Sequence, residues 1–336
     1  MTFFGQAKPA HLFFSIKIMT IFYSAFALSV VSISFSFVIN NFLIYWLYFP
    51  ELFNLFIDFQ ENNNDLIKKN IFKYLLQLVI YFAPLVYIFK LTFSNIYTIK
   101  FYSNSLRSLS AYIIRTAFYI VLVVGLVDYI ISFLRVEGLL KILLTDKFAL
   151  NLGISSFRGT YIHLPIIVIC SIISLFIKEN LSFKWLSFMI IISEFIIVIT
   201  RFIFSYEQSF MSDLVRMWYS ALFLFASSHA LITEGHVRVD VLYSQMKKKK
   251  QSLMNMIGCI FLGIPLCWTI LGCGLWTKYS SINSSLISFE VYQQGFGMYV
   301  KYIMVGFLLI FALSMIVQFM AYFLDNVRIY LVPKED

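Results

Sequence analysis

The chain has 336 residues, of which 60% are hydrophobic and 13% are charged, and its mean hydropathy is +0.84. Soluble domains have about half apolar and about a quarter charged residues, so this chain has too little polar sequence to cover a water-facing surface. This composition excludes a soluble enzyme, a secreted disulfide scaffold and a disordered tail. The net charge of +9 is typical of cytoplasmic loops that face anionic lipid, and we expect no nucleic acid partner.

Long apolar runs between polar clusters predict transmembrane helices. Backbone amides in hydrocarbon must be hydrogen-bonded within the segment, and about 20 apolar residues span the hydrocarbon core. The fold class that we predict is therefore an all-α integral membrane protein with about eight transmembrane helices. The predicted spans cover approximately residues 12–38, 71–91, 111–134, 161–177, 185–204, 214–232, 254–276 and 298–324.

Two stretches do not fit this pattern. The stretch from Phe42 to Phe59 is rich in aromatic residues, but Pro50 and Glu51 interrupt it. We expect an interfacial or re-entrant segment there rather than a ninth span, which would reverse the side of the N-terminus. Residues 135–150 place leucines beside charged residues, which predicts an amphipathic helix in the membrane interface.

The distribution of charge predicts the orientation. The loop 234–250 ends in four consecutive lysines, Lys247 to Lys250, whereas the loop 205–213 has two acids and no Lys or Arg. Cytoplasmic loops carry an excess of Lys and Arg, so the lysine loop is predicted to be cytoplasmic, as are both termini if there are eight spans. Four basic residues between the third and fourth spans disagree, because they would lie outside: Arg135, Lys141, Lys147 and Arg158.

The sequence predicts no cofactor, no metal centre and no enzymatic activity. The four cysteines lie in apolar runs without C-x-x-C spacing, and there is no Gly-rich phosphate loop and no H-E-x-x-H motif. His236 and Asp240 are four residues apart and would share a helix face, but two ligands are too few for a metal site.

Two motifs in the second half carry specific information. Arg201 ends the fifth predicted span, and twelve residues later Asp213-Leu214-Val215-Arg216 opens the sixth. The sixth span then leads into His236-Val237-Arg238-Val239-Asp240, where charged and apolar residues alternate at the predicted membrane boundary. In order, spacing and topology, residues 183–326 resemble the DctQ-like small membrane subunit of TRAP transporters, the tripartite ATP-independent periplasmic uptake systems.

The resemblance has two departures. Family members often have two acids before the leucine, where this chain has Ser212 and Asp213. They also have a proline near the start of the last helix, whereas no proline lies between Pro265 and Pro333 here. Neither change removes the order and spacing of the motifs.

The resemblance implies a domain organisation and a role. It implies an N-terminal transmembrane extension of about four helices in residues 1–180, a small permease domain of four helices in residues 183–326, and a cytoplasmic tail in residues 327–336. The small subunit of this family binds a large, DctM-like permease subunit as a scaffold. A periplasmic solute-binding protein delivers the substrate, typically an organic acid, and a sodium gradient drives uptake. The implied location is the bacterial inner membrane, with anionic lipid headgroups near Lys247–Lys250.

Polar residues inside the predicted spans keep an alternative open. Glu194, His229 and Asp128 could serve a self-sufficient proton-coupled carrier or a membrane enzyme. An ionised Glu194 at mid-span would cost about 2.5 to 3.5 kcal/mol. Arg201 is about 10 Å away along the helix axis, too far for a direct pair. No second acid at mid-span lies nearby in sequence, so we favour a protonated or hydrogen-bonded helix-packing role for Glu194.

The tryptophans and one proline lead to two further predictions. We expect Trp185, Trp218, Trp268 and Trp276 to form an interfacial aromatic belt. We also expect Pro265 to kink the seventh span.

Overall fold

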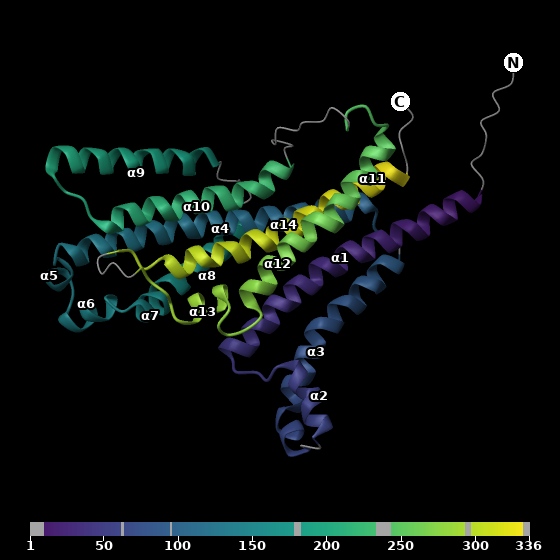
Figure 1. Ribbon diagram of the computed structural model, residues 1–336, viewed down its shortest axis with the longest axis horizontal. Coiled ribbons are helices and arrows are strands. Elements are labelled where there is room, and N and C mark those ends of the chain that lie inside the picture. The colour runs from purple at the N-terminus through teal and green to yellow at the C-terminus, as the bar shows by residue number, and fades with distance from the viewer. Residues whose placement is uncertain are drawn as a thin grey trace. The chain divides into compact units, whose positions relative to one another are not determined.

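A computed structural model describes residues 10–61, 64–94, 96–177, 183–232, 243–292 and 297–331 (Figure 1). The described residues form helices and connecting loops without a strand, which confirms the predicted all-α membrane fold. Within them, seven helical segments are long and apolar enough to cross a membrane: Lys17–Trp46, Ile67–Phe93, Ile99–Val136, Ser155–Phe176, Lys184–Phe204, Lys248–Leu275 and Lys301–Leu331. The sixth predicted span corresponds to helix α10 (Ser209–Ile232), which contains Asp213, Arg216 and several serines and is not among these seven.

The chain divides into two compact units, each built from segments that are distant in sequence. The first unit comprises Met1–Arg107, Val237–Leu266 and Ile316–Asp336, and the second comprises Ser108–His236 and Cys267–Met315. Each unit therefore contains residues from both sides of the predicted domain boundary near residue 180. That boundary stays a prediction, because residues 178–182 lie outside the described ranges.

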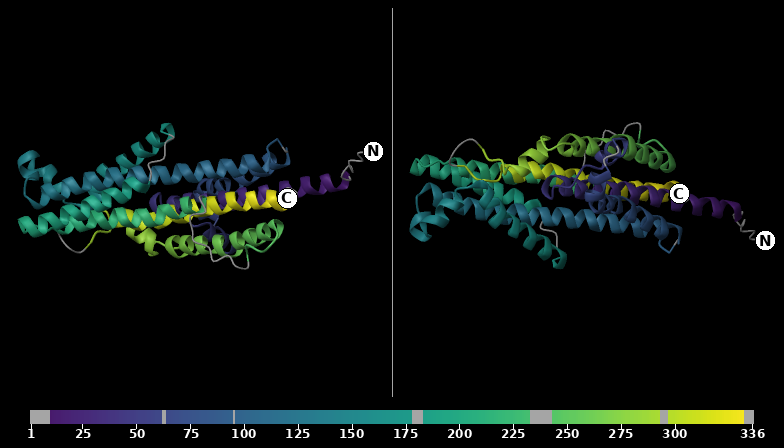
Figure 2. Two further views of the ribbon diagram at one scale, coloured as in Figure 1. Left: turned by 90° about the horizontal axis from the view of Figure 1, so that it is seen from above. Right: turned by 90° about the horizontal axis from the view of Figure 1, so that it is seen from below.

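The first unit is an arrangement of long helices. Its elements are α1 (Ala10–Trp46), α2 (Leu52–Gln60), α3 (Asn64–Phe93), the start of α4 (Ile99–Val136), α11 (Lys248–Gly258), the π-helical turn η2 (Cys259–Gly263), the start of α12 (Ile264–Leu275) and the end of α14 (Lys301–Leu331). Helix α1 packs along α3, and Ser36 donates a hydrogen bond to the carbonyl of Ile80 across that contact (2.9 Å). Asn255 of α11 donates to Asn326 of α14 (2.9 Å), and Figure 2 shows these two helices side by side.

The stretch 42–59 forms a break followed by a short helix. Helix α1 continues to Trp46, the chain turns, and α2 has nine residues, none of them buried. Nine helical residues extend about 14 Å, which is less than half of the hydrocarbon core. Gln77 of α3 holds the turn by donating to the carbonyl of Pro50 (2.9 Å).

The second unit encloses a hydrophobic core between α4, α10 and α14. Its other elements are α5 (Leu140–Leu143), α6 (Asp146–Leu152), α7 (Ser155–Arg158), the π-helical turn η1 (Gly159–His163), α8 (Leu164–Phe176), α9 (Phe183–Phe204), α13 (Ser281–Ile287) and the rest of α12. Trp218 of α10 lies in this core, is 1% exposed, and donates to the carbonyl of Val121 (3.4 Å). The prediction that Trp218 belongs to an interfacial belt is therefore wrong. The indole fits inside the unit because the neighbouring Gly125 has no side chain in its way.

Residues 135–150 differ from the single amphipathic helix that we predict. They contain α5 and the start of α6, which are separated by Leu144 and Thr145. Leu140, Ala149 and Leu152 turn inward and form a small buried cluster. Leu139, Leu143, Leu144 and Leu150 stay exposed, so only part of the leucine pattern reflects packing within the second unit.

Two of the long helices contain a π-helical turn just before a proline. In η1 the N–H of Leu164 donates to the carbonyl of Gly159, and in η2 the N–H of Ile264 donates to that of Cys259. Pro165 and Pro265 follow directly and lack the N–H that would continue the α-helical pattern. The wider turn places the irregularity ahead of the proline. The kink expected at Pro265 stays a prediction.

Candidate functional site

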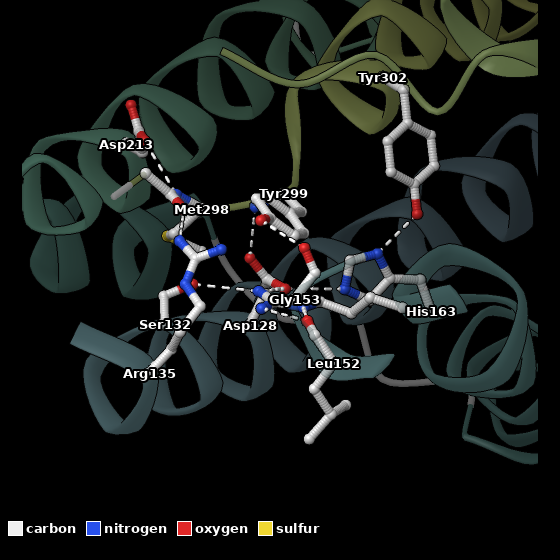
Figure 3. Close-up of polar contacts among 12 residues, drawn as sticks. Asp128, Ser132, Arg135, Leu152, Gly153, His163, Asp213, Met298, Tyr299 and Tyr302 are labelled. Atoms are coloured by element: carbon white, nitrogen blue, oxygen red, sulfur yellow. Dashed lines mark hydrogen bonds and ion pairs between the residues drawn. The ribbon is translucent and has the colours of Figure 1, made fainter. Parts of the chain in front are cut away.

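A buried carboxylate in α4 is the centre of a polar cluster in the second unit (Figure 3). Asp128 is fully buried, and its Oδ1 accepts a hydrogen bond from Nη1 of Arg158 (2.8 Å) and lies 3.1 Å from Nε2 of His163. Its Oδ2 accepts the backbone N–H of Tyr299 (2.8 Å). Both carboxylate oxygens are thus occupied, which is the condition under which a charge is tolerated in a low-dielectric interior.

Arg158 is the cation that balances this carboxylate. The side chain is also fully buried; it donates to Oγ of Ser132 (3.1 Å) and twice to the carbonyl of Leu152 (2.8 and 3.1 Å). The guanidinium lies 4.2 Å from the centre of the Tyr299 ring. Arg158 is therefore a buried residue of α7 and not a solvated charge. Arg115, which lies in α4 as Asp128 does, donates to the carbonyl of Ser174 (2.9 Å).

His163 extends the cluster to the last helix. Its Nδ1 lies 2.6 Å from the hydroxyl of Tyr302 in α14. Because Nε2 faces a carboxylate, the proton of the neutral ring belongs on Nε2, and Nδ1 then accepts the hydrogen bond of the tyrosine hydroxyl. The result is a continuous chain of hydrogen bonds from Tyr302 through His163 to Asp128.

The segment that leads into α14 is held from two helices. Met298 donates its backbone N–H to Oδ2 of Asp213 in α10 (3.0 Å), and Arg135 of α4 donates to the carbonyl of Gly297 (2.8 Å). With the bond from Tyr299 to Asp128, three successive residues are fixed by side chains of α4 and α10 (Figure 3). The cluster therefore joins the predicted extension to the predicted small permease domain.

The Asp-Leu-x-Arg motif divides between the interior and the surface. Asp213 and Leu214 are buried, and Leu214 belongs to the hydrophobic core. Arg216 is exposed and lies 3.5 Å from Asp213. Arg201 is exposed too and forms an ion pair with Glu207 (3.2 Å) rather than with Glu194.

The remaining predicted residues lie apart from the cluster. Glu194 is exposed on α9, in the middle of a helix whose apolar side chains are also largely exposed. The side chain of His229 is outside the described part of the chain, and so are His236, Arg238 and Asp240. The structure therefore brings Asp128 and Asp213 to one site and leaves Glu194 on a separate surface.

The loop between α9 and α10 is attached to the end of α4. Tyr206 donates to a carboxylate oxygen of Glu137 (2.5 Å). Burial, together with this carboxylate, raises the pKa of Tyr206 to about 12. The phenol therefore stays protonated and keeps donating over the physiological pH range.

The described part of the chain offers few groups that could bind a metal ion together. No cluster of three or more His, Cys, Asp or Glu residues there could hold a metal ion. The Asp128 cluster contains one carboxylate and one imidazole, and both are engaged by protein donors and acceptors. Its chemistry is that of a structural polar network.

Comparison with known proteins identifies the second half of the chain. Residues 190–328 match the family described as tripartite ATP-independent periplasmic transporters, DctQ component. Neither curated proteins nor solved structures gave a match to the chain. The matched range runs from within α9 to near the end of α14 and includes Asp213 and the segment before α14. Residues 190–328 therefore match the DctQ component family, the small permease of TRAP transporters, and α1–α8 precede the matched range as an N-terminal extension.

Proposed function

We propose that this chain is the scaffold subunit that supports the large, DctM-like permease subunit of a TRAP transporter. In this proposal a periplasmic solute-binding protein delivers an organic acid or a related solute, and a sodium gradient drives its uptake through the large subunit. The family match over residues 190–328 is the observation that carries the proposal. The chain would lie in the bacterial inner membrane with both termini in the cytoplasm.

Two observations support the proposed orientation. In the first unit, Lys17, Lys100 and Arg328 line one cavity, and Lys249 lies over the ring of Tyr330 (4.9 Å). The start of α1, the start of α4, the start of α11 and the end of α14 thus share a basic environment, as expected at a cytoplasmic surface. In the second unit, Arg158 is neutralised in the interior, so it no longer counts as an external charge.

Helix α9 offers a surface for the large subunit. Its Ile191, Phe195 and Phe202 are 65%, 64% and 78% exposed, and Glu194 lies among the exposed residues. In contact with lipid, an ionised glutamate at mid-span would cost about 2.5 to 3.5 kcal/mol. A neighbouring subunit that presents a hydrogen-bond donor would remove this cost. We therefore assign α9 and Glu194 to the contact with the large permease subunit.

The alternative of a self-sufficient carrier receives little support from Asp128. A transported proton or cation needs a carboxylate that can exchange partners with water. Asp128 is instead fully buried and bound by Arg158, His163 and a backbone N–H. This arrangement favours a structural role for Asp128.

Copurification tests the proposed function. The tagged full chain would be extracted in a mild detergent from cells that also produce a large permease subunit encoded beside it. We expect the two chains to elute together in size-exclusion chromatography at a constant ratio. Separate migration of the permease and the tagged chain would overturn the subunit assignment.

A further inference from the structure

The first unit contains a cavity of about 400 Å³ at its basic end. The start of α1, the end of α3, the start of α4 and the end of α14 contribute its walls. The lining residues combine hydroxyl, aromatic, aliphatic and basic side chains: Lys17, Thr20, Ile21, Ser24, Thr92, Ile96, Tyr97, Thr98, Ile99, Lys100, Tyr102, Arg328 and Leu331. The volume is within the range of small-molecule sites, which is about 300 to 1,000 Å³.

Among the described residues, this cavity has an excess of positive charge. Lys17, Lys100 and Arg328 line the cavity, and none of the lining residues is acidic. Asp325 lies one turn before Arg328 but is engaged by Arg107 and by Ser103 (2.8 Å). In the described part of the chain, the three cations make no ion pair. An anion is the ligand that this charge pattern fits.

The first turn of α4 adds a second attraction for an anion. Thr98, Ile99 and Lys100 form the start of this helix of 38 residues, and all three line the cavity. The N-terminus of a long helix presents free backbone N–H groups and a partial positive charge, which together favour phosphate. The oxygen of Thr98 accepts the N–H of Phe101 (3.3 Å), which leaves its hydroxyl proton able to donate.

The apolar part of the wall indicates what kind of molecule the anionic group belongs to. Ile21, Ile96 and Leu331 line the same cavity as the cations, and Ile96 is 71% exposed. A phosphate with an attached acyl glycerol would satisfy both halves of the wall, whereas a free phosphate would leave the apolar half in water. Basic pockets between transmembrane helices at the cytoplasmic face are suited to anionic lipid headgroups.

We propose that this cavity binds the phosphate headgroup of an anionic phospholipid. Lys17, Lys100 and Arg328 contact the phosphate oxygens, the first turn of α4 supplies further donors, and the acyl chains leave along the apolar wall. No residue of the lysine run at 247–250 lines this cavity, and most of its lining residues belong to the N-terminal extension.

Native mass spectrometry of the full chain tests this site. The purified chain, in a mild detergent, would be titrated with phosphatidylglycerol, with phosphatidylethanolamine and with inorganic phosphate as a competitor. We expect one phosphatidylglycerol to bind more tightly than phosphatidylethanolamine. The triple variant Lys17→Gln/Lys100→Gln/Arg328→Gln should weaken that binding roughly tenfold or more. The charge-matched control Lys247→Gln/Lys249→Gln/Lys250→Gln should leave it within about twofold.

A second variant guards against a loss of folding in the triple variant. Thr20→Trp fills the cavity without changing the charge, and we expect it to reduce phosphatidylglycerol binding with an unchanged melting temperature. Equal binding by the wild type and both cavity variants would overturn the proposal. So would an equal loss in the lysine-run control. Displacement of the lipid by inorganic phosphate would assign the cavity to a free anion and overturn the lipid assignment.

Discussion

The buried pair of Asp128 and Arg158 places two full charges in the interior of a chain of which only 13% is charged. Removing either charge alone leaves the other without compensation, which typically costs about 3 to 5 kcal/mol. Removing both is far less costly, because no uncompensated charge remains. The cluster therefore stabilises the second unit because its two opposite charges compensate each other.

Asp128→Asn should lower the free energy of unfolding by about 3 to 5 kcal/mol. The double variant Asp128→Asn/Arg158→Met should recover more than about 1 kcal/mol of that loss. Thermal unfolding in detergent, followed by tryptophan fluorescence, measures both. Asp146→Asn, at an exposed position of α6, is the control and should change stability by less than about 0.5 kcal/mol. A double variant less stable than Asp128→Asn would contradict the pairing.

At this scale the sequence predicts which residues are unusual, but not what they contact. Asp128 stands out as an acid inside an apolar run, whereas Arg158, His163 and Tyr299 are 30, 35 and 171 positions away in the chain. No local periodicity links such positions. The sequence contained only an indirect sign of this pair. Arg158 was one of the basic residues in excess on the predicted outer side, and the structure shows that Asp128 neutralises it in the interior of the second unit.

Among the helices, close packing at glycine decides where α4 and α10 meet. A Cβ added to Gly125 would lie 2.7 Å from Nε1 of Trp218 and 3.2 Å from Cδ1 of Leu214. The indole would have to shift to accept even a methyl group. Gly125 therefore determines the buried position of Trp218.

Gly125→Ala should destabilise the protein by about 1 to 3 kcal/mol, because the core is overpacked. Gly258→Ala is the matched control, since a Cβ there meets nothing within 4 Å. That substitution should be neutral or stabilising by up to about 1 kcal/mol through helix propensity. The melting temperatures of the two variants, compared with that of the wild type, test this. An equal change in both would contradict the role of Gly125 in packing.

The loop before α14 has a pH-dependent contact. Lys301 and Ser285 donate hydrogen bonds to Glu290, and these bonds hold its pKa below the usual value of 4.5. A carboxyl group whose pKa is lower in the folded state stabilises that state above its unfolded pKa. The contribution is lost as the pH falls through the folded pKa.

Glu290→Gln should therefore be less stable than the wild type near pH 7. The difference should shrink below about pH 4 and disappear at lower pH, when Glu290 of the wild type is protonated. Melting temperatures of both proteins between pH 7 and pH 3 test this. A gap that persists at the lowest pH would show that the contact does not depend on the carboxylate charge.

Helix positions were predictable from hydropathy, but their internal irregularities were not. The fifth predicted span, residues 185–204, agrees closely with α9 (Phe183–Phe204) because the apolar run has polar residues at both ends. Pro265 indicated that one helix had to adapt. That the adaptation is a π-helical turn, and that a second such turn precedes Pro165, was not predicted.

For the whole molecule, the family motif identified residues 183–326, and the family match covers residues 190–328. The way in which the extension joins this part was not predictable, because it depends on contacts between α4, α7, α10 and the segment before α14. Each compact unit contains chain segments from both parts. Each unit therefore combines helices of the predicted extension with helices of the predicted small permease domain.

The exposed carboxylate of α9 gives a prediction for the complex. If Glu194 faces a hydrogen-bond donor of the large permease subunit, Glu194→Lys should reduce the copurified permease at least fivefold, whereas Glu194→Gln should retain most of it. Quantitative immunoblotting of the eluted complex measures this ratio. Asp146→Lys reverses an exposed charge on α6 and serves as the control. A permease ratio in Glu194→Lys equal to that of the control would remove Glu194 from the contact.

Reconstitution into liposomes tests the central claim most directly. Uptake of a panel of radiolabelled organic acids would be measured under an inward sodium gradient, with this chain alone, with the large permease and the solute-binding protein alone, and with all three. We predict sodium-dependent uptake only when all three are present. Transport by this chain by itself, or full transport in its absence, would contradict its assignment as the scaffold subunit.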